Sequence, residues 1–398
     1  MIEKIFGPGS KPASAQEAAA MIGAELATRV SNSGADALRA GDLERAERMF
    51  RQAIDLDEKA GRADANAAIR LGNLGEVLKQ QRRFDEAELM MRRALTVERS
   101  SGGARTPEVA GRLRNLGGLL LAAGRQSEAE QTCREALEMA EACTGPDSAA
   151  TADYLTSCAM AMQESARPER AEALYRRVVE IRQRVGKEND AELAKAMYNL
   201  GYFLQRFNRV GEAESLYRKA VEVWRRDPRG DPQGFSLALN NLGMLLTFSN
   251  RAGEAEPLCR EALKVAGSTY GSDHLEVATC LCNLANALSA LRRWTEAEPL
   301  MRRALEIKEA KLGPNDPDVA VCLNNLANIL QSSGRLNEAE PLMRRHLEII
   351  VAAGKAMGRK HPYLEPAANN YARLLLEMGC SHADLVAKLD RIAPGMFA

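Results

Sequence analysis

This chain of 398 residues has no net charge and no long apolar run. Lysine and arginine together number 54, as do aspartate and glutamate, so no overall field attracts nucleic acid or an anionic membrane. No apolar stretch approaches the roughly 18 to 20 residues of a membrane-spanning helix. The opening segment, MIEKIFGPGSKPAS, lacks the apolar core of a signal peptide. We therefore expect a cytoplasmic protein that binds no nucleic acid and does not insert into a membrane.

The motifs of the common enzyme classes are also missing. The sequence has no GxSxG, HExxH or phosphate-loop motif, and no GxGxxG ahead of a helix. The four histidines are scattered; His274 and His361 stand at predicted helix starts, where capping explains them, and His346 replaces a small residue. We predict no enzymatic activity and no cofactor or metal.

Eight cysteines could suggest chemistry, but the sequence contains no CxxC. Cys280 and Cys282 form a CxC, yet they project from different faces of a predicted helix, with no histidine at ligand spacing. Cys133, Cys158 and Cys259 occupy positions that hold aromatic or apolar residues elsewhere in the chain. We expect the cysteines to behave as small buried hydrophobes.

What the chain does have is a repeated stretch, which is clearest at Val321–Ile349. Leu323, Leu326, Ala327 and Leu330 follow the i, i+3, i+4, i+7 spacing of one apolar helix face. A second amphipathic segment follows at about residues 336–350. Neither helix can bury its apolar stripe alone, so the pattern predicts helix pairs that stack on one another.

Capping residues in the sequence also predict the ends of the first helix. Asp316 before Pro317 predicts an N-cap with proline at the first helical position, and Gly334 predicts a left-handed C-terminal cap. Small residues at Ala327 and Ala339 let two helix backbones approach closely. We therefore expect these two positions to mark where the helices cross.

The period of the repeat is 42 residues. It is carried by an asparagine in the first helix, with Ser157 filling one gap, at Asn73, Asn115, Asn199, Asn241, Asn283 and Asn325. An Ala-Glu pair recurs eight times in the second helix, and an arginine follows each glutamate by four residues. That order favours a helical ion pair of about 0.2–0.5 kcal/mol, so we interpret these pairs as structural.

These residues resemble the tetratricopeptide repeat, a helix-turn-helix unit. The matching residues are Leu326-Ala327 and Leu242-Gly243 for the family's Leu-Gly pair, and Ala339 and Ala255 for its central alanine. The 42-residue period with LNNLA, AEPL and RRALEI segments is similar to the kinesin-light-chain subtype. The resemblance covers roughly residues 24–378 and implies an all-α fold, an α-solenoid that winds as a right-handed superhelix of helix pairs.

We expect one array rather than two globular domains. The predicted division is a flexible N-terminal arm (1–16), eight helix pairs of which the first is an atypical cap (17–360), and C-terminal capping helices with a frayed tail (361–398). The fourth pair, about 148–189, lacks the Asn-Leu-Gly triplet and has Pro168 in its turn, which predicts a local bend. Pro257, Pro299 and Pro341 leave two alternatives open: either the second helices start late, or each proline costs a hydrogen bond.

In the family that the chain resembles, the first helices line a concave groove that takes extended peptides or a partner's helix. The resemblance implies that the first-helix asparagines point into this groove. An asparagine amide both donates and accepts, so it can pair with a peptide backbone of any sequence. The alternative is that each asparagine bonds its own or the next repeat's backbone and fixes the stacking angle. Both roles can coexist.

Specificity is expected from varying positions on the same face. They lie one residue before or three after an asparagine, or a turn further along: Arg114, Tyr198, Asn240, Asn324, Tyr202, Met244, Asn286, Asn328 and Arg206. Tyr198, Tyr202, Arg206, Met244 and Phe248 form a predicted aromatic-cationic patch, hereafter the aromatic patch. Tyrosine and arginine are enriched in binding hot spots. The alternative is that one or both tyrosines fill space beside a neighbouring repeat.

The first functional hypothesis is therefore a protein-interaction adaptor that binds a protein or peptide ligand in the groove. A self-assembling scaffold, a homo-oligomer that stacks through its terminal repeats, is the second. The third is a regulatory subunit of a separate enzyme or secretion system that uses the same groove.

Overall fold

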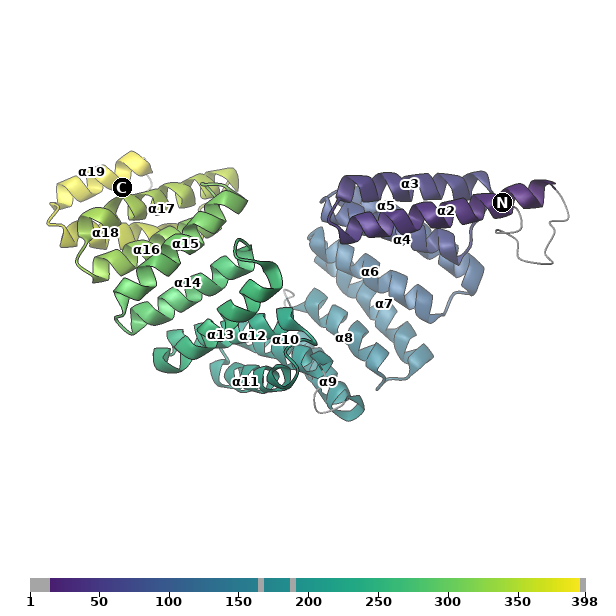
Figure 1. Ribbon diagram of the computed structural model, residues 1–398, viewed down its shortest axis with the longest axis horizontal. Helices are drawn as coiled ribbons and strands as arrows, with labels where there is room; N and C mark the ends of the chain where they lie inside the picture. Colours follow the sequence, from purple (N-terminus) through teal and green to yellow (C-terminus); the bar gives the residue numbers. More distant parts are fainter. Residues whose placement is uncertain (1–14, 164–167, 187–190, 394–398) are drawn as a thin grey trace. The chain divides into compact units, whose positions relative to one another are not determined.

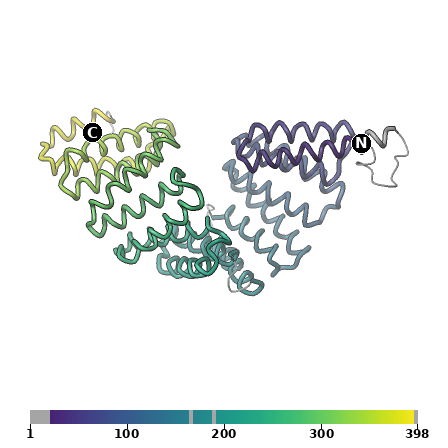
Figure 2. The backbone as a smooth tube through the Cα atoms, viewed as in Figure 1, coloured from purple at the N-terminus to yellow at the C-terminus, as the bar shows by residue number. Residues whose placement is uncertain are grey.

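The protein was analysed as a computed structural model, which describes residues 15–163, 168–186 and 191–393. Within these ranges the regular elements are all α-helices and there is no strand, which confirms the predicted all-α fold. The chain divides into two compact units, residues 1–187 (unit 1) and 188–398 (unit 2). Each unit is a stack of antiparallel helix pairs (Figures 1 and 2).

Unit 1 contains four helix pairs. Their bounds are α2 Ala15–Arg39 and α3 Leu43–Lys59, α4 Ala65–Gln80 and α5 Phe84–Gly102, α6 Pro107–Ala122 and α7 Gln126–Thr144, and α8 Ala149–Met162 and α9 Pro168–Val185. Residues 1–14 of the predicted arm lie outside the described residues, and α2 begins at Ala15. The turn that carries the predicted bend, residues 164–167, also lies outside them.

Unit 2 contains four more pairs and two closing helices. Their bounds are α10 Ala191–Arg206 and α11 Val210–Arg226, α12 Pro232–Phe248 and α13 Ala252–Tyr270, α14 Leu275–Ala290 and α15 Trp294–Leu312, α16 Pro317–Ser332 and α17 Leu336–Ala356, with α18 Leu364–Glu377 and α19 His382–Ile392. In both units each helix packs most closely on its neighbours in the chain. The division into arm, eight pairs and terminal cap stays a prediction.

The first helices begin at side-chain caps, as the linker composition predicts. The Asp316 side chain accepts a hydrogen bond from the Asp318 N–H, with Pro317 in the first turn. The other first-helix caps of this kind are Asp64, Thr106, Ser148, Asp231 and His274. Gly334 has φ +81°, which confirms the predicted left-handed position after α16.

The turn between the two helices of a pair uses that left-handed position in every pair whose turn the structure describes. Where no glycine stands there, Arg82, Asn208, Asn250 or Arg292 takes a positive φ of about 60°. Asparagine tolerates this region well, but a side chain such as arginine is strained in it. The geometry of the turn is therefore kept even where the residue is unfavourable.

The second helices start early, which settles the alternatives left open by their prolines. α13, α15 and α17 begin at Ala252, Trp294 and Leu336, so each proline is the sixth residue of its helix. The first four N–H groups of a helix lack internal partners in any case, but the sixth does not. A late start is therefore wrong, and each of these helices lacks one backbone hydrogen bond.

Small residues lie where the two helices of a pair cross, as predicted. A Cβ added at Gly75 would lie 2.7 Å from Met91 Cγ and 3.3 Å from the Ala87 carbonyl oxygen. At the equivalent Gly243, an added Cβ would lie 2.5 Å from Cys259 Sγ. The bulkier residue of the second helix fills the space that the small one leaves. Ala327 and Ala339 occupy these positions in the α16–α17 pair, and both are fully buried.

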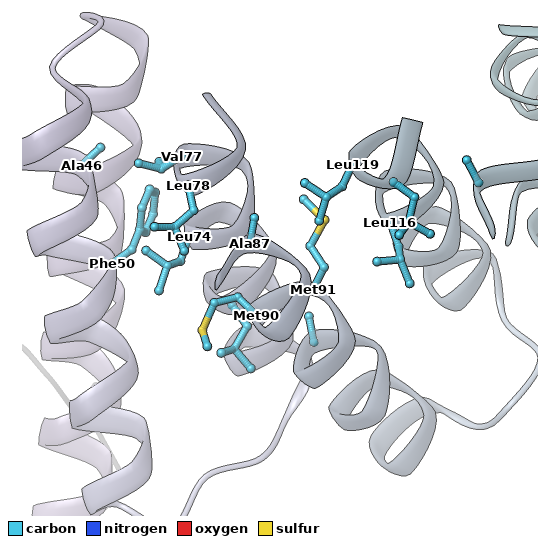
Figure 3. Packing of buried hydrophobic residues seen from close by; sticks show 14 of the residues in the cluster. Ala46, Phe50, Leu74, Val77, Leu78, Ala87, Met90, Met91, Leu116 and Leu119 are labelled. Atoms are coloured by element: carbon cyan, nitrogen blue, oxygen red, sulfur yellow. The ribbon is translucent and has the colours of Figure 1, made fainter. Parts of the chain in front are cut away.

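The apolar core of unit 1 runs between the pairs without interruption. Phe50 of α3 packs with Leu74 and Leu78 of α4, and Met91 of α5 faces Leu119 of α6 (Figure 3). All five are at most 3% exposed. Truncating such a residue to alanine costs about 2–5 kcal/mol, so the repeated stripe is what holds the stack together.

Six of the eight cysteines are buried, namely Cys133, Cys158, Cys259, Cys280, Cys282 and Cys322, whereas Cys143 is exposed and Cys380 is partly exposed. Buried positions agree with the prediction for these six. The described residues contain no cluster of three or more potential metal ligands. They also contain no helix with the length and apolar character needed to cross a bilayer.

Candidate functional site

The first-helix asparagines of unit 2 lie on one face of successive first helices. Asn199, Asn241, Asn283 and Asn325 come from α10, α12, α14 and α16, and all four are half-buried. This placement follows from the 42-residue period, because equivalent residues of stacked pairs share a face.

Neighbouring first helices in unit 2 are joined by hydrogen bonds from these amides, a set that we call the amide ladder. Asn241 Nδ2 donates to Tyr198 Oη at 2.9 Å, and Asn283 Nδ2 donates to Asn240 Oδ1 at 2.9 Å. In both cases the acceptor stands just before the previous asparagine, 43 residues back. The amides therefore fix how pairs stack, as one alternative proposed, but through side chains rather than the backbone.

The ladder continues at the C-terminal end after one break. Asn370 of α18 donates to Asn324 Oδ1 at 3.0 Å. Asn325 would need an acceptor at residue 282, which is a cysteine, and its Oδ1 instead accepts from Asn324 Nδ2 at 3.2 Å. The ladder thus lacks one hydrogen bond, because the Cys282 thiol stands where the acceptor for Asn325 would be.

The ladder amides of Asn241 and Asn283 each use the NH2 group as a donor but leave the carbonyl oxygen without a hydrogen bond from the described residues. Within the described part of the chain, the Oδ1 atoms of Asn241 and Asn283 accept no hydrogen bond, although both residues are half-buried. A carbonyl oxygen in that position can accept an N–H from a bound chain. The stacking role and the binding role are therefore compatible in the same side chain.

Unit 1 has no such ladder at Asn73 and Asn115. The residue before Asn73 is Gly72, which offers no side-chain acceptor, and Asn115 is exposed. Arg114, one residue earlier, lies over the ring of Tyr154 with its guanidinium carbon 5.1 Å from the ring centroid. Within the described part of unit 1, no hydrogen bond thus joins the predicted groove residues to one another.

The aromatic patch divides into an anchored part and an exposed part. Tyr198 is half-buried, and its ring centroid lies 5.7 Å from that of Tyr217 and 6.4 Å from that of Trp224. Burial raises the pKa of Tyr198 to about 12, so its hydroxyl stays protonated. Tyr198 therefore fills space, as the alternative interpretation held, and also accepts the Asn241 amide.

The exposed part carries the surface that could be covered by a partner. Tyr202 stacks on Tyr198 with 6.5 Å between ring centroids and is 45% exposed, while Phe248 is 78% exposed. Met244 is half-buried and Arg206 is exposed. A phenylalanine that exposed at the end of a well-packed helix contributes little to the core of its own chain.

Sequence reasoning missed one member of this surface. Phe207 directly follows α10, is 44% exposed, and packs on Phe203 with ring centroids 4.7 Å apart. Only positions at fixed offsets from the asparagines were considered, and Phe207 has no such offset. Its place beside Arg206 at the end of the first helix was the available signal. Asn286 and Asn328, the remaining predicted residues, are half-buried on α14 and α16.

The glutamate–arginine pairs form a second ladder on the second helices. Glu256 Oε1 pairs with Arg260 Nη2 at 2.9 Å in its own helix, and Glu256 Oε2 pairs with Arg293 Nη1 at 2.7 Å in the next pair. Arg293 Nε also pairs with Glu296 Oε1 at 2.7 Å. The structural interpretation of the glutamate–arginine motif is thus supported, and the arginine that starts most of the second helices, such as Arg293, is an added link.

These links change the acidity of the shared glutamates. Burial tends to raise the pKa of Glu88, but hydrogen bonds from Arg92 and Arg125 outweigh it, and the pKa lies below its ordinary value. The same causes lower the pKa of Glu298 in unit 2. Glu88 and Glu298 are therefore ionised at neutral pH. The linking arginines recur at 42-residue spacing, so the arithmetic that found the glutamates could also have found them.

Buried ion pairs were not anticipated at all. Arg70 Nη1 and Asp57 Oδ2 are 2.5 Å apart, with both side chains at most 3% exposed. Asp57 also lines a small cleft of about 290 Å³, and its Oδ1 accepts no hydrogen bond from the described residues. One pair further along, Arg112 Nε lies 3.1 Å from Glu98 Oε2. Both ion pairs join a second helix to the next first helix within unit 1.

Comparison with solved structures finds the same architecture at low identity. The apo form of the quorum sensor NprR from B. thuringiensis is 13% identical, covers 83% of this chain and 88% of its own, and has a TM-score of 0.60. The signal-transduction ATPase PH0952 from Pyrococcus horikoshii, with a tetratricopeptide repeat sensor, is 16% identical over 89% of this chain and 52% of its own, with a TM-score of 0.57.

Kinesin-light-chain repeats from Podosopora anserina also align. They are 18% identical over 52% of this chain and 97% of their own, with a TM-score of 0.45. Identities at this level establish a shared fold only. Among curated proteins, none matches this sequence significantly.

Models of the tetratricopeptide repeat match most of the sequence. One matches residues 25–100, 108–184, 234–310 and 281–350, and another matches residues 193–226. Repeats of this kind indicate a role in protein interaction. Together with the stacked helix pairs and the recurring small residues at the helix crossings, these matches establish that the chain belongs to the tetratricopeptide repeat family.

Proposed function

We propose that this chain is a non-enzymatic adaptor, and that unit 2 binds a peptide or a segment of a partner protein along the faces of α10, α12 and α14. The observation that carries the proposal is the pairing of exposed rings with unused amide acceptors. Tyr202 and Phe248 offer apolar surface, and Asn241 and Asn283 offer free carbonyl oxygens beside them. The expected cytoplasmic location remains part of this proposal.

Physical chemistry favours such a combination for a bound chain. Covering Phe248 and Tyr202 removes apolar surface from water, which is worth about 25 cal/mol per Å². The amide oxygens can accept backbone N–H groups, whose burial without partners would be costly. Because the amides are already held by Tyr198 and Asn240, little side-chain entropy is lost on binding.

A photo-crosslinking experiment tests the proposal. A photoreactive phenylalanine analogue is placed at Phe248 or at Tyr202, and a matched control carries it at Ser215, an exposed position on the second helix α11. We expect the same partner to be captured from positions 248 and 202 but not from 215. Capture should fall when Asn241 and Asn283 are changed to alanine in a chain that keeps its helical circular dichroism. Equal capture from position 215 would refute the proposed face.

A regulatory role through the same face is a variant of this proposal. The structure of NprR is that of a quorum sensor, and PH0952 carries a repeat sensor next to an ATPase. Those names describe those proteins, and for this chain they suggest that the captured partner is itself an enzyme or a regulator. The identity of the partner captured at position 248 distinguishes this from a purely structural adaptor.

Self-assembly is the second candidate, and the first helix favours it. Met21, Ile22 and Leu26 of α2 are 40–46% exposed and lie within two turns of each other. A second copy could cover these side chains. Light scattering over a concentration series tests this: self-assembly predicts a mass that rises with concentration and stays monomeric after Met21, Ile22 and Leu26 are changed to serine. A constant monomer mass rules the scaffold out.

A further inference from the structure

Two thiols meet between neighbouring first helices of unit 2. Cys282 Sγ of α14 and Cys322 Sγ of α16 are 3.2 Å apart. Cys282 is 6% exposed and Cys322 is fully buried. They lie where the amide ladder is broken, since Cys282 occupies the acceptor position that Asn325 would use. Neither thiol has a part in the proposed binding face.

We propose that Cys282 and Cys322 are an oxidation site that takes a hydroperoxide and forms a reversible disulfide, which joins α14 to α16. Cys133 and Cys158 of unit 1 are a second pair of neighbouring buried thiols, but the Cys158 thiol donates to the Cys133 carbonyl oxygen at 2.8 Å, whereas Cys282 and Cys322 meet sulfur to sulfur. Cys280 stands two residues before Cys282 and is equally buried, but its sulfur lies 4.0 Å from the Ser236 hydroxyl. The exposed Cys143 and the partly exposed Cys380 are on other elements.

The local charges favour the reaction. The hydrogen bond between the two thiols lowers the pKa of Cys322 and raises that of Cys282. The Lys308 ammonium, itself 7% exposed, acts in the same direction on Cys322 by its charge. The thiolate is the nucleophilic form of cysteine, so Cys322 is the attacking group and Cys282 the resolving group.

The Cys322 thiolate attacks one oxygen of hydrogen peroxide, the O–O bond breaks, and hydroxide leaves, taking up the proton that Cys322 had released. Cys322 is then a sulfenic acid. The Cys282 sulfur displaces the sulfenic hydroxyl group, its thiol proton goes to that leaving group, and the S–S bond forms. Two thiols are oxidised, one peroxide is reduced, and two water molecules are released.

The repeat itself supplies substitutions that fit the fold. Positions equivalent to Cys282 hold Asn240 and Asn324, and positions equivalent to Cys322 hold Ala196 and Ala238. Cys282→Asn and Cys322→Ala therefore place residues that the same backbone already accepts elsewhere. Cys280→Ala is the matched control, because it removes a buried thiol of the same helix whose sulfur lies beside the Ser236 hydroxyl.

The test uses the full chain with Cys143→Ser and Cys380→Ser. The protein is treated with hydrogen peroxide, alkylated after unfolding, and analysed by intact mass and by tryptic peptides. Arg293 and Arg303 allow cleavage between the two cysteines. We expect the loss of two alkylatable thiols and of two hydrogens in mass, one linked peptide pair, and full reversal by dithiothreitol.

The variants decide the assignment. The linked pair should persist in Cys280→Ala and vanish in both Cys282→Asn and Cys322→Ala, while circular dichroism stays helical. Protein oxidised in guanidinium should lose this selectivity, because the fold no longer brings the two sulfurs together. Persistence of the link in Cys282→Asn, or overoxidation to sulfinic acid without any link, would overturn the proposal.

Discussion

Unit 1 and unit 2 use one repeat but fill the layer between neighbouring pairs differently. In unit 1 the layer holds the buried ion pairs Asp57–Arg70 and Glu98–Arg112. The equivalent second-helix positions in unit 2 are Trp224, Ala266, Lys308 and Ile350, all buried. Only Lys308 is charged, and its partner Asp318 is exposed and 3.9 Å away, while the first helices of unit 2 are joined by amides. The small residues at the helix crossings are common to both units, but the chemistry between one pair and the next is not.

The difference teaches that stacking geometry and stacking chemistry are separable. A buried ion pair adds little net stability but is very costly to break from one side. An amide rung contributes about 0.5–1.5 kcal/mol and leaves an oxygen for a ligand. In unit 2 the same face can therefore serve both stacking and binding. In unit 1 the charged groups between the pairs neutralise each other, so their charge is not offered to a ligand.

The largest expected effect comes from breaking an ion pair in unit 1. Arg70→Ala leaves the Asp57 carboxylate buried without its counter-charge, and we expect a loss of about 3–5 kcal/mol in the free energy of unfolding of unit 1. Urea unfolding, followed by hydrogen exchange of α3 and α4, measures it. The control is Arg93→Ala, which removes an exposed pair with Glu58 and should cost under about 1 kcal/mol. Equal effects of the two variants would show that burial of the pair does not matter.

The second test removes one asparagine from each unit. Asn283→Ala deprives the buried Asn240 of its donor, and we expect a loss of about 1–3 kcal/mol in unfolding free energy. Asn115→Ala in unit 1 removes an exposed side chain and should change stability by no more than about 0.5 kcal/mol. Thermal unfolding of both variants compares them. Equal losses of unfolding free energy in the two variants would mean that the amide ladder does not stabilise the chain.

The third test repairs the ladder. Cys282→Asn supplies an acceptor 43 residues before Asn325, and we expect a gain of about 0.5–1.5 kcal/mol in unfolding free energy. Urea unfolding under reducing conditions is the measurement. Cys282→Ala, which supplies no acceptor, is the control and should not stabilise the chain. A loss of stability in Cys282→Asn would contradict the interpretation of Cys282 as a missing rung.

The smallest effect is a difference in pH dependence. His346 of unit 2 is buried, and its Nδ1 lies 2.9 Å from the Ala320 carbonyl oxygen. Burial lowers its pKa below the ordinary 6.5, and the hydrogen bond to Ala320 opposes this only in part. As pH falls below about 6.5, the unfolded chain takes up a proton that the folded one resists, so stability declines.

Hydrogen exchange at pH 7.5, 6.5 and 5.5 checks this expectation. The decline should be confined to unit 2, because all four histidines lie there. It should also shrink in His346→Ala, which copies the residue at the equivalent Ala304. Loss of stability in unit 1 should begin only near the ordinary glutamate pKa of 4.5 and continue below it, as glutamates such as Glu88 take up protons. A decline in unit 1 over the upper interval would contradict the assignment to His346.

Much of the fold could be predicted from the sequence because it depends on local patterns. The apolar spacing around Leu326, the cap at Asp316 and the left-handed Gly334 are each decided within a few residues. The helix crossing at Ala327 and Ala339 could be predicted because two backbones approach closely only where the side chains are small. The prolines of the second helices left two alternatives open, because Pro341 fits either a late start or a lost hydrogen bond, and only the start of α17 at Leu336 decides between them.

The site was predictable only in part. The period placed the asparagines on one face, but their acceptors lie 43 residues earlier, and that offset depends on how one pair is seated on the next. The buried Arg70 and the half-buried Arg112 could not be predicted from apolar periodicity, because a charged residue interrupts the apolar pattern. Phe207 lies outside the periodic positions, so periodicity alone could not find it.

The arginine at the start of most second helices has one more consequence. Arg293 pairs backwards with Glu256 and within its own hairpin with Glu296, and Arg335 does the same with Glu298 and Glu338. Each hairpin with such an arginine therefore offers the same ionic contacts to the hairpin that precedes it. A whole 42-residue cassette could be gained or lost by unequal recombination, and the new neighbours would find their ionic partners already in place.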